Sequence, residues 1–257
     1  MKARMKVSMK VSIKATAAGL ALGMIFLGTS AYAEPIHIES EALTLDNGAA
    51  YADDRVTVLA SSGTVLQLSL TELLARNNNA GATWSAYDDQ GNYQQAGASY
   101  NTGYQLTVRE GYRITSIDWN LTFAGQLQQA TSPLDPPGQA ANRTAEGMQL
   151  ISNGNVVGSD ARFIDNLNGT GQLQLSFATP DWYPALGLEL QSGVWMAAQG
   201  IPPNGILPGL PSFASMNMTD AVLTIHTVMV PVPEPSTYAM LLGGLALVGA
   251  MARRRRD

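Results

Sequence analysis

Residues 117–123 read Ile-Asp-Trp-Asn-Leu-Thr-Phe, and this stretch decides the fold class of the chain. Apolar side chains occupy every second position, and Asp, Asn and Thr stand between them. A period of two is typical of a β-strand with one buried face and one exposed face. We therefore predict a half-buried strand here, with Trp119 in the core.

The same pattern continues on both sides of this strand. Residues 173–177 repeat the alternation, and residues 56–60 and 65–70 flank a Ser-Ser-Gly loop that predicts a hairpin. Residues 106–108 lead through Glu-Gly towards the strand at 117, which we interpret as a second hairpin-like join. Residues 221–230 are apolar on both faces, so we predict a central strand that closes the domain.

Turn-forming residues separate the predicted strands. Asp, Asn and Gly cluster at 46–48, 88–92, 153–155 and 166–171, and prolines mark loops at 133–138 and 202–211. Residues 71–75 predict a single helical turn, and no long amphipathic helix is evident. The fold class predicted for residues 34–230 is all-β: one antiparallel β-sandwich domain, with a jelly roll as a candidate topology.

The N-terminus has the features of a secretory signal peptide. Basic residues without any acid precede an apolar run at 15–27, and Ala31 and Ala33 provide small side chains at a cleavage site. We predict that residues 1–33 are a signal peptide, exported by the Sec machinery and cut by signal peptidase before Glu34. An uncleaved N-terminal anchor is the alternative.

The C-terminus combines three elements within residues 231–257. Pro233, Glu234 and Pro235 precede an apolar run at 236–252, and a basic cluster ends the chain: Arg253, Arg254, Arg255 and Arg256. As a helix the apolar run is roughly 25 Å long, slightly shorter than the ~30 Å core of a bilayer. The arginines favour a cytoplasmic end, so we predict a transmembrane helix at 236–252 that holds the exported domain at the inner membrane.

This order of elements resembles the PEP-CTERM sorting signal of Gram-negative bacteria. The resemblance covers only the C-terminal 27 residues. It implies an exosortase as processing partner, with Pro233, Glu234 and Pro235 as the recognised residues. It also implies an inner-membrane precursor with a periplasmic domain, delivered later to the cell surface or to an exopolysaccharide and biofilm matrix. An ordinary tail anchor, in which the prolines only end the last strand, is the alternative.

The exported domain differs in charge from the whole chain. All lysines lie within residues 1–33, and residues 34–230 hold six arginines against 18 acidic residues, a formal net charge of −12. Such a surface repels nucleic acid and anionic lipid, so we expect no nucleic-acid partner. The chain has no cysteine, which excludes disulfides and thiol chemistry.

Residues for catalysis or metal binding are sparse. His37 and His226 are the only histidines in the sequence, and there is no Gly-x-Ser-x-Gly motif. Asp118 and Glu189 remain candidates for a carboxylate pair of the glycosidase type, although we expect no catalytic residue. The loops at 88–92 and 160–169 could hold calcium or be structural turns. We expect no metal and no cofactor.

Aromatic residues provide the best candidate contacts with a ligand. Trp84 and Tyr87 begin a segment rich in Gln and Asn, and Trp182 and Tyr183 lie in a loop between prolines. Sugar rings stack on exposed aromatics, whereas core packing is the alternative role. The leading hypothesis is a non-enzymatic envelope protein with a structural or adhesive role in an exopolysaccharide matrix. A lectin-like module and a glycan-processing enzyme are the alternatives.

Overall fold

A computed structural model of the chain describes residues 36–47, 56–71, 84–179, 181–231 and 240–247. Several predicted features lie outside these ranges: the signal peptide with Ala31, Ala33 and Glu34, most of the helical turn at 71–75, the residues Pro233, Glu234 and Pro235, and the cluster Arg253, Arg254, Arg255 and Arg256. The structure therefore tests the body of the protein.

Six strands form the first sheet. In spatial order they are β1 (His37–Glu39), β2 (Leu43–Asn47), β6 (Gln94–Val108), β11 (Ala185–Gln199), β8 (Gln139–Ser152) and β9 (Asn155–Asp165). The long strands β6, β11 and β8 make its centre, and each pairing is antiparallel.

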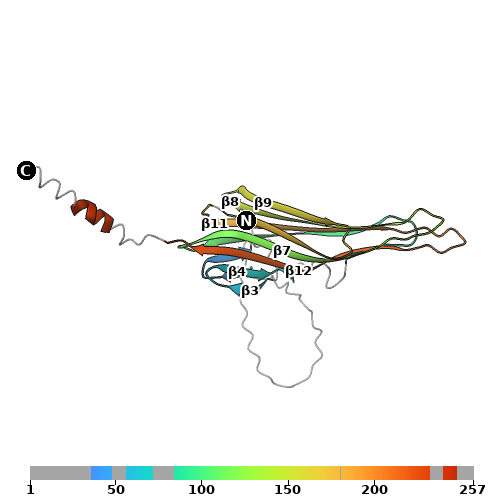
Figure 1. Ribbon diagram of the computed structural model, residues 1–257, viewed down its shortest axis with the longest axis horizontal. Helices are drawn as coiled ribbons and strands as arrows, with labels where there is room; N and C mark the ends of the chain where they lie inside the picture. Colours follow the sequence, from blue (N-terminus) through green and yellow to red (C-terminus); the bar gives the residue numbers. More distant parts are fainter. Residues whose placement is uncertain (1–35, 48–55, 72–83, 180, 232–239, 248–257) are drawn as a thin grey trace, which may run out of the picture. The chain divides into compact units, whose positions relative to one another are not determined.

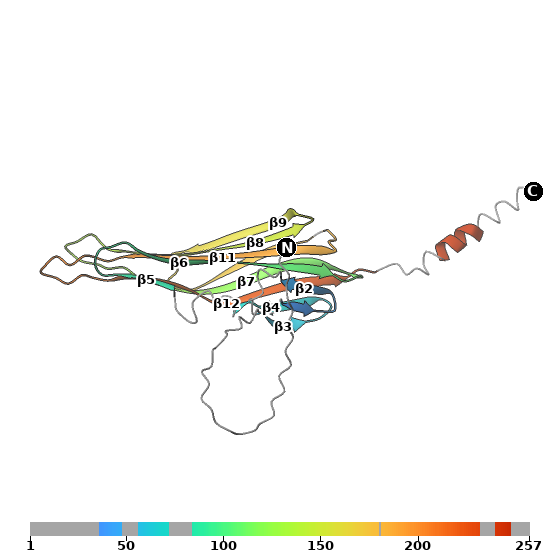
Figure 2. The same cartoon turned by 180° about the vertical axis from the view of Figure 1, so that it is seen from behind.

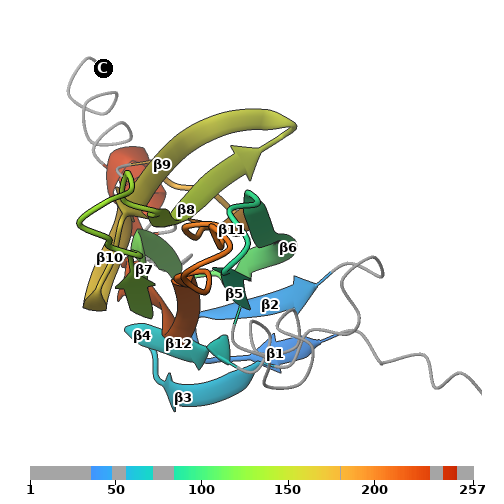
Figure 3. The same cartoon turned by 90° about the vertical axis from the view of Figure 1, so that its right-hand side faces the viewer.

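The second sheet packs against the first and has β12 at its centre. Its order is β10 (Gly169–Ala178), β7 (Tyr112–Gln128), β12 (Ser212–Met229), β4 (Val65–Ser69) and β3 (Thr57–Ser61), and β5 (Trp84–Asp88) pairs with β12 as well. The two layers are visible in Figure 1 and, end-on, in Figure 3. Figure 2 shows β5 and β4 following one another along β12. The predicted antiparallel β-sandwich is confirmed.

The core lies between the inward faces of the two sheets. Ile117, Trp119, Leu121 and Phe123 are buried, and the residues between them are not, so the predicted strand is confirmed with its register. Leucines of β2, β6, β8 and β11 meet this row from the first sheet. Burial of apolar area at roughly 25 cal/mol per Å² stabilises the sandwich, which has no cysteine to cross-link it.

The hairpin predictions have mixed outcomes. β3 and β4 pair as expected around residues 62–64. The join between β6 and β7 is not a hairpin: β6 pairs with β2 and β11 in the first sheet, and β7 pairs with β10 and β12 in the second. Gly111, at φ 83°, makes a tight turn there, and Tyr112 N donates to Arg109 O at 3.2 Å. The predicted hairpin-like join was therefore wrong. The same turn residues serve a strand that returns beside its neighbour and a strand that crosses to the other sheet, so they do not distinguish the two.

Other turn predictions are confirmed. Asn153 and Gly154 both have positive φ, 51° and 78°, and they join β8 to β9 as a two-residue hairpin loop. Asp88 is buried, and its carboxylate accepts hydrogen bonds from Gln90 N at 3.2 Å and Gly200 N at 2.8 Å. Asp88 therefore has a structural role in its turn.

The predicted closing strand is also confirmed. β12 is central, with β7 on one side and β5 and then β4 on the other. Beyond it, residues 240–247 form a helix, which is part of the predicted transmembrane segment 236–252. Within the described ranges, no helix has both the length and the apolar character needed to cross a membrane.

Asn142 is a buried polar link between the two sheets. Its side-chain Nδ2 donates to Leu167 O at 2.8 Å and to Ser215 O at 2.7 Å. Its side-chain Oδ1 accepts from Leu167 N at 2.7 Å. We expect Asn142→Ala to leave all three backbone groups without these partners and to lower the free energy of unfolding by about 2–3 kcal/mol. Urea unfolding measures this; a loss below ~0.5 kcal/mol would contradict the role assigned to Asn142.

Candidate functional site

A shallow trough runs along the outward face of the first sheet, centred on β11. Because successive side chains of a strand alternate between faces, the odd-numbered residues of β6, β11 and β8 all point outward here. The register aligns them in rows across the sheet. From one end to the other the rows are Gln105–Gly187–Ile151, Gly103–Glu189–Gln149, Asn101–Gln191–Gly147, Ser99–Gly193–Ala145 and Gly97–Trp195–Arg143. We call these residues the trough.

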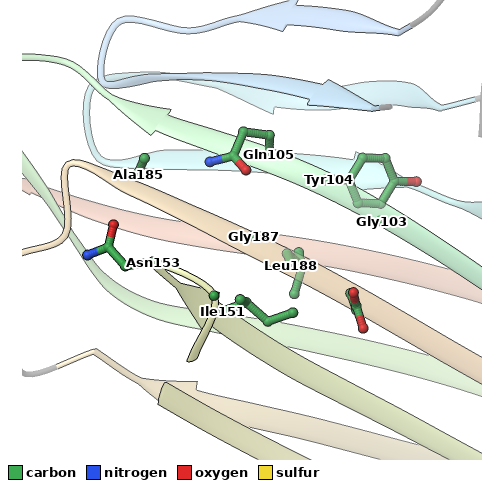
Figure 4. Close-up of a pocket in the computed structure, with 10 residues that line it drawn as sticks. Gly103, Tyr104, Gln105, Ile151, Asn153, Ala185, Gly187 and Leu188 are labelled. Carbon is green, nitrogen blue, oxygen red and sulfur yellow. The ribbon is translucent and has the colours of Figure 1, made fainter. Parts of the chain in front are cut away.

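The trough contains two neighbouring hollows. One, of about 580 Å³, is lined by Gln105, Gly187, Glu189 and Ile151, together with the hairpin at Asn153. Figure 4 shows Gln105, Gly187 and Ile151 on three neighbouring strands of its floor. The other, of about 530 Å³, continues along β11 between Asn101, Gln191 and Phe163. Both are open, so an extended ligand can lie along the sheet.

Three glycines of the trough floor, Gly147, Gly187 and Gly193, stand where the fold does not require glycine, whereas a Cβ at Gly97 would lie 2.8 Å from Val194 O. A Cβ added at Gly193 would have its nearest neighbour at 3.8 Å, at Gly147 at 3.7 Å, and at Gly187 at 3.4 Å. These are ordinary contact distances, and none of the three has a positive φ. Glycine weakens a strand interior, and it often marks a bulge, a bend or a place where a ligand or another backbone approaches closely. The floor is therefore kept low at a cost in stability.

One wall of the trough has an aromatic and charged character. Arg143 stacks over the Phe163 ring, 4.9 Å from its centroid, and its Nε lies 3.4 Å from Asp165 Oδ1. Phe163 is 60% exposed, and Trp195, in the same row as Arg143, is 37% exposed. Amides, one carboxylate and exposed aromatic rings are the groups that fix hydroxyl-rich ligands in open sites.

Glu146 lies beneath the trough, on the inner face of β8. It is 2% exposed, and its Oε1 accepts from Thr144 Oγ1 at 2.5 Å and from Ser192 Oγ at 3.2 Å. Its Oε2 has no partner. Burial raises the pKa of this carboxyl to about 8, and the two hydroxyl hydrogen bonds only partly oppose the rise. Glu146 is thus protonated under neutral conditions.

The aromatic residues predicted as ligand contacts fall at two separate places. Trp84 and Tyr87 lie on β5, where Trp84 packs against the core and Tyr87 is exposed. Trp182 is exposed in the loop before β11, and Tyr183 packs against the core. Trp84 is opposite Met216 of β12, and Trp182 lines a hollow with Val228, about 40 Å further along that strand. The four residues do not form one site.

The candidate carboxylates point away from each other. Asp118 lies on the outward face of β7 in the second sheet, and Glu189 lies on the outward face of β11 in the first. Asp118 accepts from Ser176 Oγ at 2.5 Å and lies 3.4 Å from His226 Nε2. Because the carboxylate stands between serine and histidine, this cluster does not have the serine–histidine contact of a hydrolytic triad.

The remaining candidates have structural partners. His37 lies between Asp46 and Glu39, which together raise the pKa of its imidazole, and Asp46 has the larger effect. No group of three or more metal-binding side chains occurs among the residues that the structure describes. The loops at 88–92 and 160–169 provide no such cluster within the described part of the chain.

The trough was not among the sites predicted from the sequence. The glycines that mark it occupy outward positions of β6, β8 and β11. Which face of a sheet a residue occupies depends on the register of its strand, and the sequence alone does not give that register. Tyr100 and Tyr104 of β6 follow Trp84 and Tyr87 in the segment rich in Gln and Asn, and their side chains point inward to the core.

Fold and tail define the class of this protein: a two-sheet, all-β domain followed by a C-terminal sorting signal. Residues 231–256 match the PEP-CTERM protein-sorting motif, which confirms the resemblance. The motif indicates an exported protein that an exosortase processes. No curated protein matches the chain.

Solved structures with some similarity include carbohydrate-binding modules and viral proteins. TmCBM61 in complex with β-1,4-galactotriose is 9% identical, covering 65% of this chain and 87% of its own, with a TM-score of 0.19. A CBM4 structure is 8% identical, covering 48% and 82%, also with a TM-score of 0.19. The VP2 subviral particle of infectious bursal disease virus is 12% identical, covering 70% and 43%, with a TM-score of 0.24.

Proposed function

We propose that this protein is a non-enzymatic matrix component that binds neutral polysaccharide along the trough. The glycine floor carries the proposal: Gly147, Gly187 and Gly193 lower a sheet face where neither packing nor backbone conformation requires glycine. An extended chain of sugars can then approach the backbone closely, with Gln105, Asn101 and Gln191 beside it as donors and acceptors. The role is structural or adhesive.

The charge of the domain selects the class of polysaccharide. Residues 34–230 have a net charge of −12, and the two arginines that line the trough, Arg143 and Arg162, already face Asp165 and Asp160. Long-range repulsion therefore disfavours polyanionic chains. A glycan array on residues 34–230 tests the proposal. Retention of neutral polysaccharide with weaker retention of uronic-acid polymers is expected, and retention of no sugar above background would contradict it.

The placement of the two candidate carboxylates supports binding without hydrolysis. Asp118 and Glu189 lie on opposite outer faces of the sandwich, so they cannot flank one glycosidic bond. We expect no new reducing ends when the domain is incubated with the polysaccharide that it binds. Sustained release of reducing ends, lost in Glu189→Gln, would instead favour the glycan-processing alternative.

Before it reaches the matrix, the chain follows the route that its termini specify. Residues 1–33 direct export through the Sec machinery, and residues 236–252 hold the precursor in the inner membrane, with the arginine cluster in the cytoplasm. The exosortase then acts near Pro233, Glu234 and Pro235, and the domain leaves the membrane.

Glu234→Ala tests the processing step. We expect the variant to keep its full tail, because the acidic residue between the prolines is the recognised group. Intact mass of the protein from its host then shows a chain that still contains Arg253 to Arg256. Glu41→Ala, a substitution of an exposed acid in the sandwich, is the matched control and should be processed normally. Equal processing of both variants would contradict recognition through Glu234.

A further inference from the structure

An exposed apolar patch lies where the sandwich ends and the sorting motif begins. Trp182, Val228, Met229, Val230 and Pro231 line a hollow of about 380 Å³, together with Arg113. We call these five apolar residues the Trp182 patch. Trp182 is 63% exposed and Met229 is 65% exposed. The indole is held in place, because its Nε1 donates to Tyr112 O at 3.3 Å. A fixed, exposed tryptophan beside exposed methionine and valines is typical of a contact surface.

The patch is tied by a short length of chain to the apolar tail. Pro231 lines the hollow and is also the first residue of the motif match. Nine residues later, at Met240, begins a helix whose side chains are all apolar, with Met240, Leu241, Leu242, Leu245 and Leu247 exposed. Nine residues span at most about 32 Å. The membrane or other apolar environment that takes up the tail helix therefore lies within about 32 Å of the patch.

We infer that, in the precursor, the Trp182 patch rests in the interfacial layer of the membrane that holds the tail. The inference rests on the membrane-anchored precursor of the proposed function. Tryptophan favours this layer, because its ring is apolar and its N–H is polar. Arg113 at the same hollow is suited to lipid phosphate groups. The contact holds the motif close to the membrane surface, where a membrane-embedded processing enzyme works.

The strength of this contact depends on the tether. The domain carries a net charge of −12 over residues 34–230, so it has no general attraction to anionic lipid. The patch is small, and it gains from the high effective concentration that the attached tail provides. Once the tail is removed, the same surface should leave the membrane, so processing and release are one event.

Tryptophan quenching by lipid tests this inference with the full chain. The chain is inserted into phosphatidylcholine vesicles with or without a lipid that carries a quencher near its headgroup. Flotation first establishes that the chain is bound to the vesicles. We expect at least a twofold larger quenched fraction in the wild type than in Trp182→Phe. The matched control Trp195→Phe removes an exposed tryptophan from the trough and keeps Trp182, so its quenched fraction should be at least as large as that of the wild type.

The outcomes separate the two claims. A chain that floats with the vesicles, yet is quenched equally in the wild type and in Trp182→Phe, overturns the contact and leaves the anchor intact. A chain that does not float overturns the anchor, and the inference fails with it. Strong quenching that disappears in Trp182→Phe alone supports the contact.

Discussion

Gly193→Val should weaken polysaccharide binding at least tenfold without weakening the fold. A valine here fills the centre of the trough, between Ser99 and Ala145. The nearest atom to an added Cβ is 3.8 Å away, so the side chain begins without a clash, and we expect its methyl groups to block a ligand. We expect affinity to fall by tenfold or more, equivalent to at least about 1.4 kcal/mol. Replacing glycine by a β-branched residue should meanwhile raise the free energy of unfolding by about 0.5–1 kcal/mol.

Calorimetric titration and urea unfolding together check this prediction. Ala124→Val is the matched control, because Ala124 is exposed on β7 in the second sheet and the substitution also adds bulk. The control should bind as the wild type does. If Gly193→Val binds normally, the ligand does not lie on this face. If Gly193→Val lowers the free energy of unfolding, the fold requires glycine at this position, and the low floor no longer indicates a binding site.

Glu146→Gln should remove a large pH dependence of stability. The pKa of Glu146 is about 8 in the folded protein and close to 4.5 in the unfolded chain. Unfolding above pH 4.5 therefore releases a proton, and stability falls as the pH rises until about pH 8. Each pH unit between these values lowers the free energy of unfolding by up to ~1.4 kcal/mol, so the full loss is at most about 5 kcal/mol. The amide does not titrate and still accepts from Thr144 and Ser192.

Urea unfolding at several values between pH 5 and pH 8 measures the difference between the two proteins. The difference removes the contributions of titratable groups that both proteins share, such as His37. We expect Glu146→Gln to gain stability relative to the wild type at each step towards pH 8. Parallel curves would show that Glu146 is ionised in the folded state across this range and that its environment is more polar than the structure indicates.

The local parts of the fold could be predicted from the sequence, and the reasons are physical. The strand at 117–123 lies in a sheet with one buried face, so its alternation gives both the element and the burial of Trp119. The loop at 153–155 follows because Asn-Gly adopts positive φ readily. The C-terminal sorting motif is a linear pattern, so its prediction needs no knowledge of the fold.

Non-local features were beyond the sequence. The turn at 109–111 has the same chemistry in a hairpin and in a crossover, and only the partners of β6 and β7 distinguish the two. The trough arises from three strands that are far apart in the sequence and are brought into register by pairing. For the same reason only the folded chain shows that Trp84 and Trp182 lie beside distant parts of β12, Trp84 at Met216 and Trp182 at Val228.

Partition of the protein in its native host tests the central claim most directly. Extracellular polysaccharide is sedimented from cultures that express either the wild type or Gly193→Val, and intact mass is measured in each fraction. We predict that both proteins lose the arginine tail, that the processed wild type sediments with the polysaccharide, and that the processed variant stays in the supernatant. A wild-type domain absent from the polysaccharide, or a variant that sediments equally well, would contradict polysaccharide binding in the trough.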